Sequence, residues 1–197
     1  MDEVLRSLLD PFDPEVLDRD PCTVYIVDGD LRIRFVNKAW TDFAREHGAP
    51  WDARAGGAWG VGSSVLEAVP PMLKPFYEEL FARASITRAP VEHTYECSTP
   101  THQVHYRMRI LPCGQTGLLV THSVARDEVH PGPDCEPLEA RYRDANGLIV
   151  QCSHCRRVRR VGSTPPTWDW VPAYVEQVPS DTSHGLCAVC LDYYYPR

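Results

Sequence analysis

Four cysteines arranged in two pairs are the residues whose spacing most directly predicts chemistry in this chain. Cys152 and Cys155 form one C-x-x-C pair, and Cys187 and Cys190 form a second. Each pair places two thiolates on one tight turn, and two pairs supply the four soft ligands of a closed tetrahedral zinc site with metal–sulfur distances of about 2.3 Å. Because four cysteines leave no open position, the zinc is expected to be structural and to contribute folding free energy to the surrounding segment.

Two alternatives would use the same cysteines. Disulfides need an oxidising compartment, which no feature of the chain indicates. An iron–sulfur cluster could be held by the same four thiolates. The 31 residues between the pairs exceed the roughly 15 to 20 of a usual zinc ribbon, so a small folded insert is expected between them. The other four cysteines are interpreted as small buried hydrophobic residues: Cys22, Cys97, Cys113 and Cys135.

The composition indicates a globular protein with one domain of ordinary size and a small satellite. The chain has 197 residues, of which 43% are hydrophobic and 24% charged. Its net charge of -7 argues against nucleic-acid binding over most of its surface. The sequence has no apolar run of about 20 residues and no signal-peptide pattern at its start, so we expect a cytoplasmic protein that does not contact membranes.

Strand and helix patterns alternate in the first half of the chain. Residues 23–27 and 31–36 alternate apolar and polar around Asp28-Gly29-Asp30, which predicts a β-hairpin. Asn37 is a natural cap for a helix predicted over residues 38–46, with Gly48 as its stop, and a glycine-rich loop is predicted over residues 49–62.

A longer helix and three strands follow. Leu73, Phe76, Leu80, Phe81 and Ala84 recur at helical spacing and predict one buried helix face. Strands are predicted over residues 91–97, 103–111 and 117–124. Two strands, helices and then three strands predict an α+β fold: a five-stranded antiparallel sheet with helices on one face.

This order and several segments resemble PAS domains. The segments are Val24-Tyr-Ile-Val-Asp28, Arg34-Phe-Val-Asn-Lys-Ala-Trp40, Thr94-Tyr-Glu-Cys-Ser-Thr-Pro100, Tyr106-Arg-Met-Arg-Ile-Leu-Pro112 and Leu119-Val-Thr-His-Ser-Val124. The resemblance covers about residues 20–125 and implies a sensor of the kind found in bacterial signalling proteins. Six residues could line a cavity for an apolar or aromatic metabolite, and the same six equally describe a filled core: Trp40, Phe43, Phe76, Leu80, Tyr106 and Met108.

The best-known PAS cofactors require residues that are missing here. The Asn-Cys-Arg-Phe-Leu-Gln motif of photoactive flavin-binding members is absent, and residues 63–89 contain no histidine to hold haem as in the oxygen-sensing type. His93, His105 and His122 lie on predicted strands, from which they could ligate metal only in unusual positions, and they are interpreted as surface or core strand residues. The PAS ligand therefore stays unidentified.

The segment around the cysteine pairs also resembles a known tail. Cys152-Ser-His-Cys-Arg-Arg-Val-Arg159 and Ser183-His-Gly-Leu-Cys-Ala-Val-Cys190 look like the cysteine-rich module that follows PAS or receiver domains in bacterial signalling proteins. The resemblance implies a metal-binding accessory role. The predicted organisation is a cap helix and connector (1–20), a PAS-like domain (21–125), a proline-rich linker (126–139) and a four-cysteine zinc module (140–197).

Charged and imidazole side chains flank the predicted zinc site. His154 and His184 could each donate an N–H to a ligand sulfur, or be solvent-facing. Four arginines could bind an acidic partner or offset the charge of -2 on a zinc–tetrathiolate centre: Arg156, Arg157, Arg159 and Arg160.

The predicted function is signalling without catalysis. The chain has no nucleophile elbow, phosphate-cradling glycine loop or His-x-x-Glu zinc motif, so it is not expected to be an enzyme. We expect a PAS-type small-molecule or redox sensor that forms a homodimer and acts on an unidentified signalling protein. The alternatives are a constitutive interaction adaptor without a ligand and a zinc-dependent nucleic-acid-binding regulator.

Overall fold

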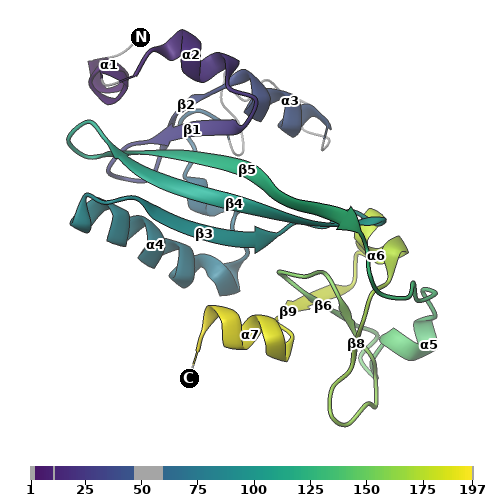
Figure 1. Cartoon of the computed structure of the whole chain (residues 1–197). Helices are drawn as coiled ribbons and strands as arrows, with labels where there is room; N and C mark the ends of the chain where they lie inside the picture. Colours follow the sequence, from purple (N-terminus) through teal and green to yellow (C-terminus); the bar gives the residue numbers. More distant parts are fainter. Residues whose placement is uncertain (1–2, 11, 47–59, 197) are drawn as a thin grey trace. The chain divides into compact units, whose positions relative to one another are not determined.

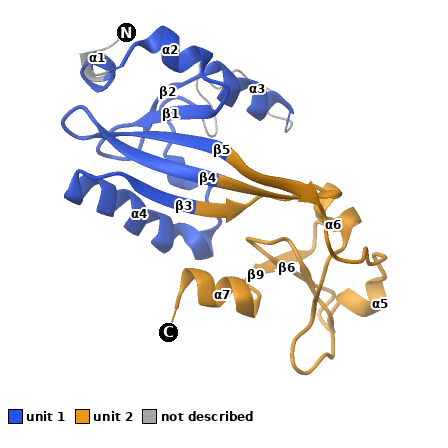
Figure 2. Ribbon diagram, viewed as in Figure 1, with its two compact units in different colours: residues 1–93, 107–123 blue, residues 94–106, 124–197 orange. Residues whose placement is uncertain are grey.

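The structure, a computed structural model, describes residues 3–10, 12–46 and 60–196 (Figure 1). The predicted stop at Gly48 and most of the predicted loop over residues 49–62 lie outside these ranges. The chain divides into two compact units: unit 1 comprises residues 1–93 and 107–123, and unit 2 comprises residues 94–106 and 124–197 (Figure 2). Unit 2 therefore contains the end of strand β3 and part of strands β4 and β5 as well as the cysteine pairs.

Unit 1 opens with the predicted hairpin. Strands β1 (Thr23–Val27) and β2 (Ile33–Val36) are antiparallel, with Tyr25 opposite Val36. The Asp28 carboxylate closes the turn by accepting hydrogen bonds from two backbone N–H groups, those of Asp30 and Arg32, each at 3.0 Å. This local bonding explains why the Asp-Gly-Asp turn was predictable from the sequence.

Helix α3 (Lys38–Glu46) begins at the predicted cap. The Asn37 side-chain oxygen accepts a hydrogen bond from the Trp40 N–H at 2.9 Å. The same oxygen accepts from Val24 N–H of β1 at 3.0 Å, so one buried side chain joins the hairpin to the helix. The predicted capping role is confirmed and is accompanied by a role in tertiary packing.

The sheet has the predicted five antiparallel strands, in the order β2-β1-β5-β4-β3. The three later strands are β3 (Val91–Glu96), β4 (His102–Cys113) and β5 (Gly117–Val129). Strand β5 continues five residues past its predicted end, into the segment assigned to the linker. Its side chains from Val124 onward are exposed, so no apolar alternation marks this extension in the sequence.

Helices cover the face of the sheet that carries Tyr25. Short 3-10 helices η1 (Val65–Ala68) and η2 (Pro71–Leu73) lead into helix α4 (Lys74–Thr87). Its buried residues are Leu80, Phe81 and Ala84, which confirms this part of the predicted apolar face. Leu73 is buried just before the helix begins, and Phe76 is partly buried.

The second face of the sheet is covered by the amino-terminal helices, so helices lie on both faces. Helices α1 (Glu3–Leu9) and α2 (Pro14–Arg19) pack on the side chains that alternate with Tyr25. This second cluster contains Leu8, Leu9, Val24, Ile26, Cys113 and Leu119. The amino-terminal helix lies close to the sheet at Gly117. An added Cβ there would lie 2.1 Å from Leu8 Cδ2 and 3.1 Å from the Val27 carbonyl oxygen, so a larger residue would displace the Leu8 side chain.

The later part of unit 2 forms a small mixed fold. Its helices are α5 (Glu139–Tyr142), α6 (Pro172–Glu176) and α7 (Ala188–Tyr194). Its strands are β6 (Ile149–Cys152), β7 (Val158–Arg159), β8 (Trp168–Asp169) and β9 (Thr182–Gly185), in the order β8-β7-β6-β9. Its core contains Tyr142, Ile149, Val158, Val171 and Tyr174. The expected folded insert between the cysteine pairs is thus present.

None of the helices within the described ranges has the length and apolar character needed to cross a bilayer.

Candidate metal centre

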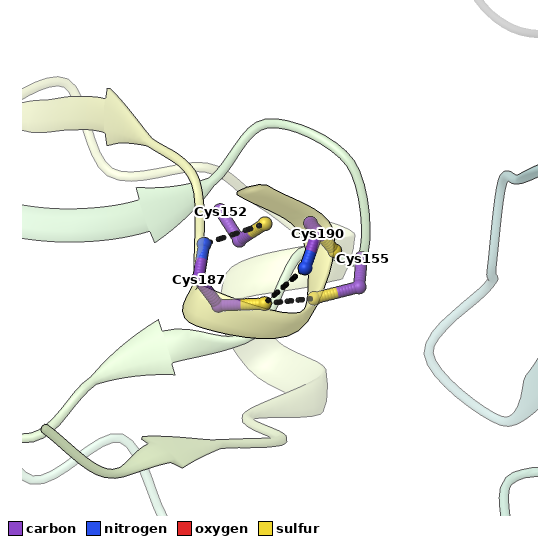
Figure 3. Close-up of side chains that lie close together, drawn as sticks. All are labelled: Cys152, Cys155, Cys187 and Cys190. Atoms are coloured by element: carbon purple, nitrogen blue, oxygen red, sulfur yellow. Dashed lines mark hydrogen bonds between the residues drawn. The ribbon is translucent and has the colours of Figure 1, made fainter. Parts of the chain in front are cut away.

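Parallel pairing of β6 with β9 brings the two cysteine pairs together. Cys152 ends β6 and pairs in register with Gly185, two residues before Cys187. Cys155 follows in the turn after β6, whereas Cys190 lies in the first turn of α7. Two segments separated by the 31-residue insert therefore meet at one point (Figure 3).

The four sulfur atoms form a compact, buried tetrad. All of them lie within 4.8 Å of one another, and Cys155 Sγ is 3.8 Å from Cys187 Sγ. A tetrahedron with metal–sulfur bonds of about 2.3 Å has sulfurs about 3.8 Å apart, which agrees with this distance. The four residues are only 1% to 5% exposed, and none of the eight cysteines, all within the described ranges, forms a disulfide. The tetrad can therefore hold a metal ion.

Backbone groups support the tetrad. Cys187 N–H donates to Cys152 Sγ at 3.4 Å, and Cys190 N–H donates to Cys187 Sγ at 3.5 Å (Figure 3). The first turn closes through Arg156 N–H to the Cys152 carbonyl oxygen at 3.1 Å, with Arg156 at a φ of 59°. N–H groups directed at sulfur stabilise the thiolate form that binds metal.

The proximity of the sulfurs moves their pKa values in opposite directions. Hydrogen bonds from Cys155, Cys187 and Cys190 hold the pKa of the Cys152 thiol far below its usual value. Interactions with Cys152, Cys155 and Cys187 raise the pKa of Cys190 far above it. Four adjacent thiolates cannot coexist without a compensating cation, and a divalent metal ion supplies that charge.

The predicted arginine cluster divides between two roles. Arg160 forms a bidentate ion pair with Asp169, with Nε–Oδ2 and Nη2–Oδ1 distances of 3.0 and 2.9 Å. Arg157 lies beside the tetrad: burial opposes its charge, but Cys155 and Glu96 raise its pKa overall. Arg156 and Arg159 are partly buried. The positive charge of Arg157 can therefore offset negative charge on the tetrad, which is one of the two roles that the sequence predicted for the arginines.

The two predicted flanking histidines have different surroundings. His154 is partly buried, and its Nδ1 lies 2.7 Å from the Tyr194 hydroxyl. Its ring packs edge-on against Tyr194, with 5.0 Å between the ring centroids. His184 lies on β9 with its side chain exposed. The structure therefore ties His154, and not His184, to the fold around the tetrad.

The six candidate cavity residues are only partly brought together. Leu80 and Met108 are buried in unit 1, and Phe76 contacts His93 with 4.9 Å between ring centroids. Phe43 is 38% exposed, and Tyr106 lies in unit 2, stacked on Tyr95. Trp40 contacts Tyr25 edge-on at 4.9 Å.

The interior of unit 1 also contains Tyr25 and Tyr77, which the sequence did not single out, next to two histidines that the sequence placed on strands. Tyr25 stacks on His122 with 5.6 Å between ring centroids, and His122 is electrostatically coupled to His93. His93 in turn contacts Phe76 and Tyr77. Because Tyr25 alternates with Val24 and Ile26 on β1, the strand pattern could have placed Tyr25 on the opposite face of the sheet from those two residues. Its neighbour His122 could not be predicted in this way, because it depends on the register between β1 and β5.

His122 predicts a pH dependence of stability. Burial, followed by the neighbouring His93, lowers the pKa of His122 to about 4, from 6.5 in the unfolded chain. Between these two pH values the unfolded chain binds a proton at His122 and the folded chain does not. The free energy of unfolding is therefore highest above pH 6.5 and decreases as the pH falls towards 4. The decrease in the free energy of unfolding across this window is up to about 3 kcal/mol. Unfolding titrations at several pH values are expected to show this slope.

The variant His122→Phe keeps a ring against Tyr25 but cannot titrate, so its unfolding free energy is expected to depend less on pH in this window. The exposed His184→Gln serves as the matched control and should keep the parent slope. Equal slopes for His122→Phe and the parent chain would refute this assignment.

Comparison with known proteins identifies the larger part of the chain. The PAS fold profile matches residues 17–130. Similar solved structures include the PAS domain of BvgS from Bordetella pertussis (20% identity, TM-score 0.44, covering 57% of this chain and 82% of that one). Another is a sensory box sensor histidine kinase from Vibrio cholerae (18% identity, TM-score 0.41, covering 57% of this chain and 88% of that one). No curated protein matches. Since the profile spans more than half of its residues, the chain belongs to the PAS-fold family.

Proposed function

We propose that this chain is a cytoplasmic signalling protein in which the PAS domain senses a small molecule or a redox change and the four-cysteine module contacts a signalling partner. PAS-family membership supports the sensory role. The observation that carries the proposal is the convergence of four buried cysteines, supplied by two distant pairs, in a chain that also contains a PAS domain. A four-cysteine site leaves no open position for a substrate, which supports a structural role over a catalytic one.

Zinc is the metal that best fits this tetrad. Four thiolates in tetrahedral arrangement, held on two C-x-x-C turns, are the preferred ligand set for structural zinc. Iron–sulfur clusters use the same ligands, but a cluster needs room for its own iron and sulfide atoms. Sulfurs only 3.8 Å apart, as at Cys155 and Cys187, match a single ion. We therefore propose that the module binds one zinc ion, which would hold β6 and α7 together.

The interior of unit 1 supports ligand sensing over constitutive interaction. The indole N–H of Trp40 is buried and has no hydrogen-bond partner among the described residues. It lies beside Tyr25, which stacks on His122, so aromatic surface and a polar donor occur together. A buried unsatisfied donor is costly, and a ligand with an acceptor atom would relieve that cost. The proposed ligand is an aromatic or apolar metabolite with a hydrogen-bond acceptor.

Native mass spectrometry of the purified chain, with an absorption spectrum, tests this proposal. We expect one zinc ion per chain, a bound small molecule and a dimeric assembly. The variant Trp40→Phe keeps the ring but removes the donor, so it should retain less of the small molecule than the control Trp168→Phe. A chain that carries no small molecule, even after incubation with metabolite extract, would contradict ligand sensing and favour the adaptor function.

A further inference from the structure

Helix α7 is short and begins at the second cysteine pair. It has seven residues, which is too short for a stable isolated helix in water. Its cap is Cys187, whose sulfur accepts the Cys190 N–H, and Cys190 itself lies in its first turn. Because two of the four candidate metal ligands lie at this helix start, a bound metal ion would hold α7 in place.

The last turn of α7 returns to the first cysteine pair. Tyr194 is 4% exposed, and its hydroxyl lies 2.7 Å from His154 Nδ1, between Cys152 and Cys155 in the sequence. Both ends of α7 are therefore joined to the metal centre, one through sulfur and one through this hydrogen bond.

The neighbouring tyrosine connects α7 to the sheet. Within unit 2, the Tyr193 hydroxyl donates a hydrogen bond to the Thr94 carbonyl oxygen of β3 at 3.1 Å. Strand β3 is last in the order β2-β1-β5-β4-β3, so among the strands that the structure describes it has a neighbour on one side only. Edge strands depend on such contacts to hold their outer backbone groups.

We propose that occupancy of the four-cysteine site controls the edge strand β3, with Tyr193 transmitting the state of the metal centre to Thr94. Metal binding orders α7 and holds the end of β3, whereas metal loss releases it. By linkage, any change in the sheet that displaces β3 alters metal affinity by the same factor. This inference rests on the proposed metal centre and adds a regulatory route to it.

Hydrogen–deuterium exchange of the full chain, read by mass spectrometry with metal content measured in parallel, tests this route. In the metal-loaded variant Tyr193→Phe, amides of residues 91–97 are expected to exchange about fivefold faster than in the parent chain, with metal content unchanged. Removal of metal from the parent chain with a chelator should accelerate the same amides at least as much. Amides of β1 should keep their parent rates in both cases.

The matched control is Val189→Ala, which alters a side chain on the same helix that is 79% exposed. Its β3 exchange should equal that of the parent. If metal binds at one ion per chain but neither Tyr193→Phe nor chelation affects β3, the inference is wrong while the metal centre stands. If the parent chain binds no metal, both are wrong.

Discussion

Replacing Cys187 with alanine is expected to abolish stoichiometric metal binding and to unfold the segment from β6 to α7. Cys187 supplies one sulfur of the tetrad, caps α7 and donates its backbone N–H to Cys152. Structural zinc sites contribute about 10 to 16 kcal/mol of apparent binding free energy in small zinc-binding peptides, so loss of one ligand removes most of the stabilisation of this segment. Metal analysis and limited proteolysis of residues 140–197 measure the two effects.

The control for this variant is Cys97→Ala, since Cys97 lies in the same unit but is exposed and outside the tetrad. It should bind one metal ion per chain and resist proteolysis as the parent does. Retention of one tightly bound ion by Cys187→Ala would contradict the four-cysteine assignment.

The second large effect is expected at Asn37 in unit 1. Its side chain is 0% exposed and makes five hydrogen bonds that its replacement by alanine would remove. Two of these are accepted from backbone N–H groups, those of Val24 and Trp40, and three are donated to carbonyl oxygens of residues 17–22. Buried groups left without partners cost about 1 to 3 kcal/mol each, so Asn37→Ala should destabilise unit 1 by about 4 kcal/mol in denaturant titrations.

The variant Asn37→Asp separates the hydrogen bonds that the side-chain oxygen accepts from those that the side-chain amide donates. It keeps an oxygen that can cap α3 and accept from Val24, but it loses the donors to the carbonyl groups. Metal binding should be unchanged in both variants, because Asn37 lies in unit 1 and the tetrad in unit 2. A change of less than about 1 kcal/mol in Asn37→Ala would show that the network contributes little to stability.

Features fixed by local chemistry were predictable from the sequence. The hairpin over β1 and β2, the Asn37 cap and the buried face of α4 all arise within short segments, so apolar periodicity and turn residues sufficed. The four cysteines were equally recognisable, because two short pairs restrict which residues can share one metal ion.

Features set by long-range contacts were not predictable. Parallel pairing of β6 with β9, which brings the two pairs together, depends on residues about 33 apart. The extension of β5 and the packing of α1 and α2 on the second face follow from backbone pairing and register. The arginines after Cys155 looked equivalent in sequence, yet Arg160 pairs with Asp169 while Arg157 lies at the tetrad.

X-ray absorption spectroscopy at the zinc edge of the purified chain measures the central feature, one metal ion held by both cysteine pairs. We predict a first shell of four sulfur atoms at about 2.3 Å and no nitrogen or oxygen ligand. A first shell with fewer sulfurs, or a metal-free chain in which Cys152, Cys155, Cys187 and Cys190 are joined in disulfides, would contradict the assignment.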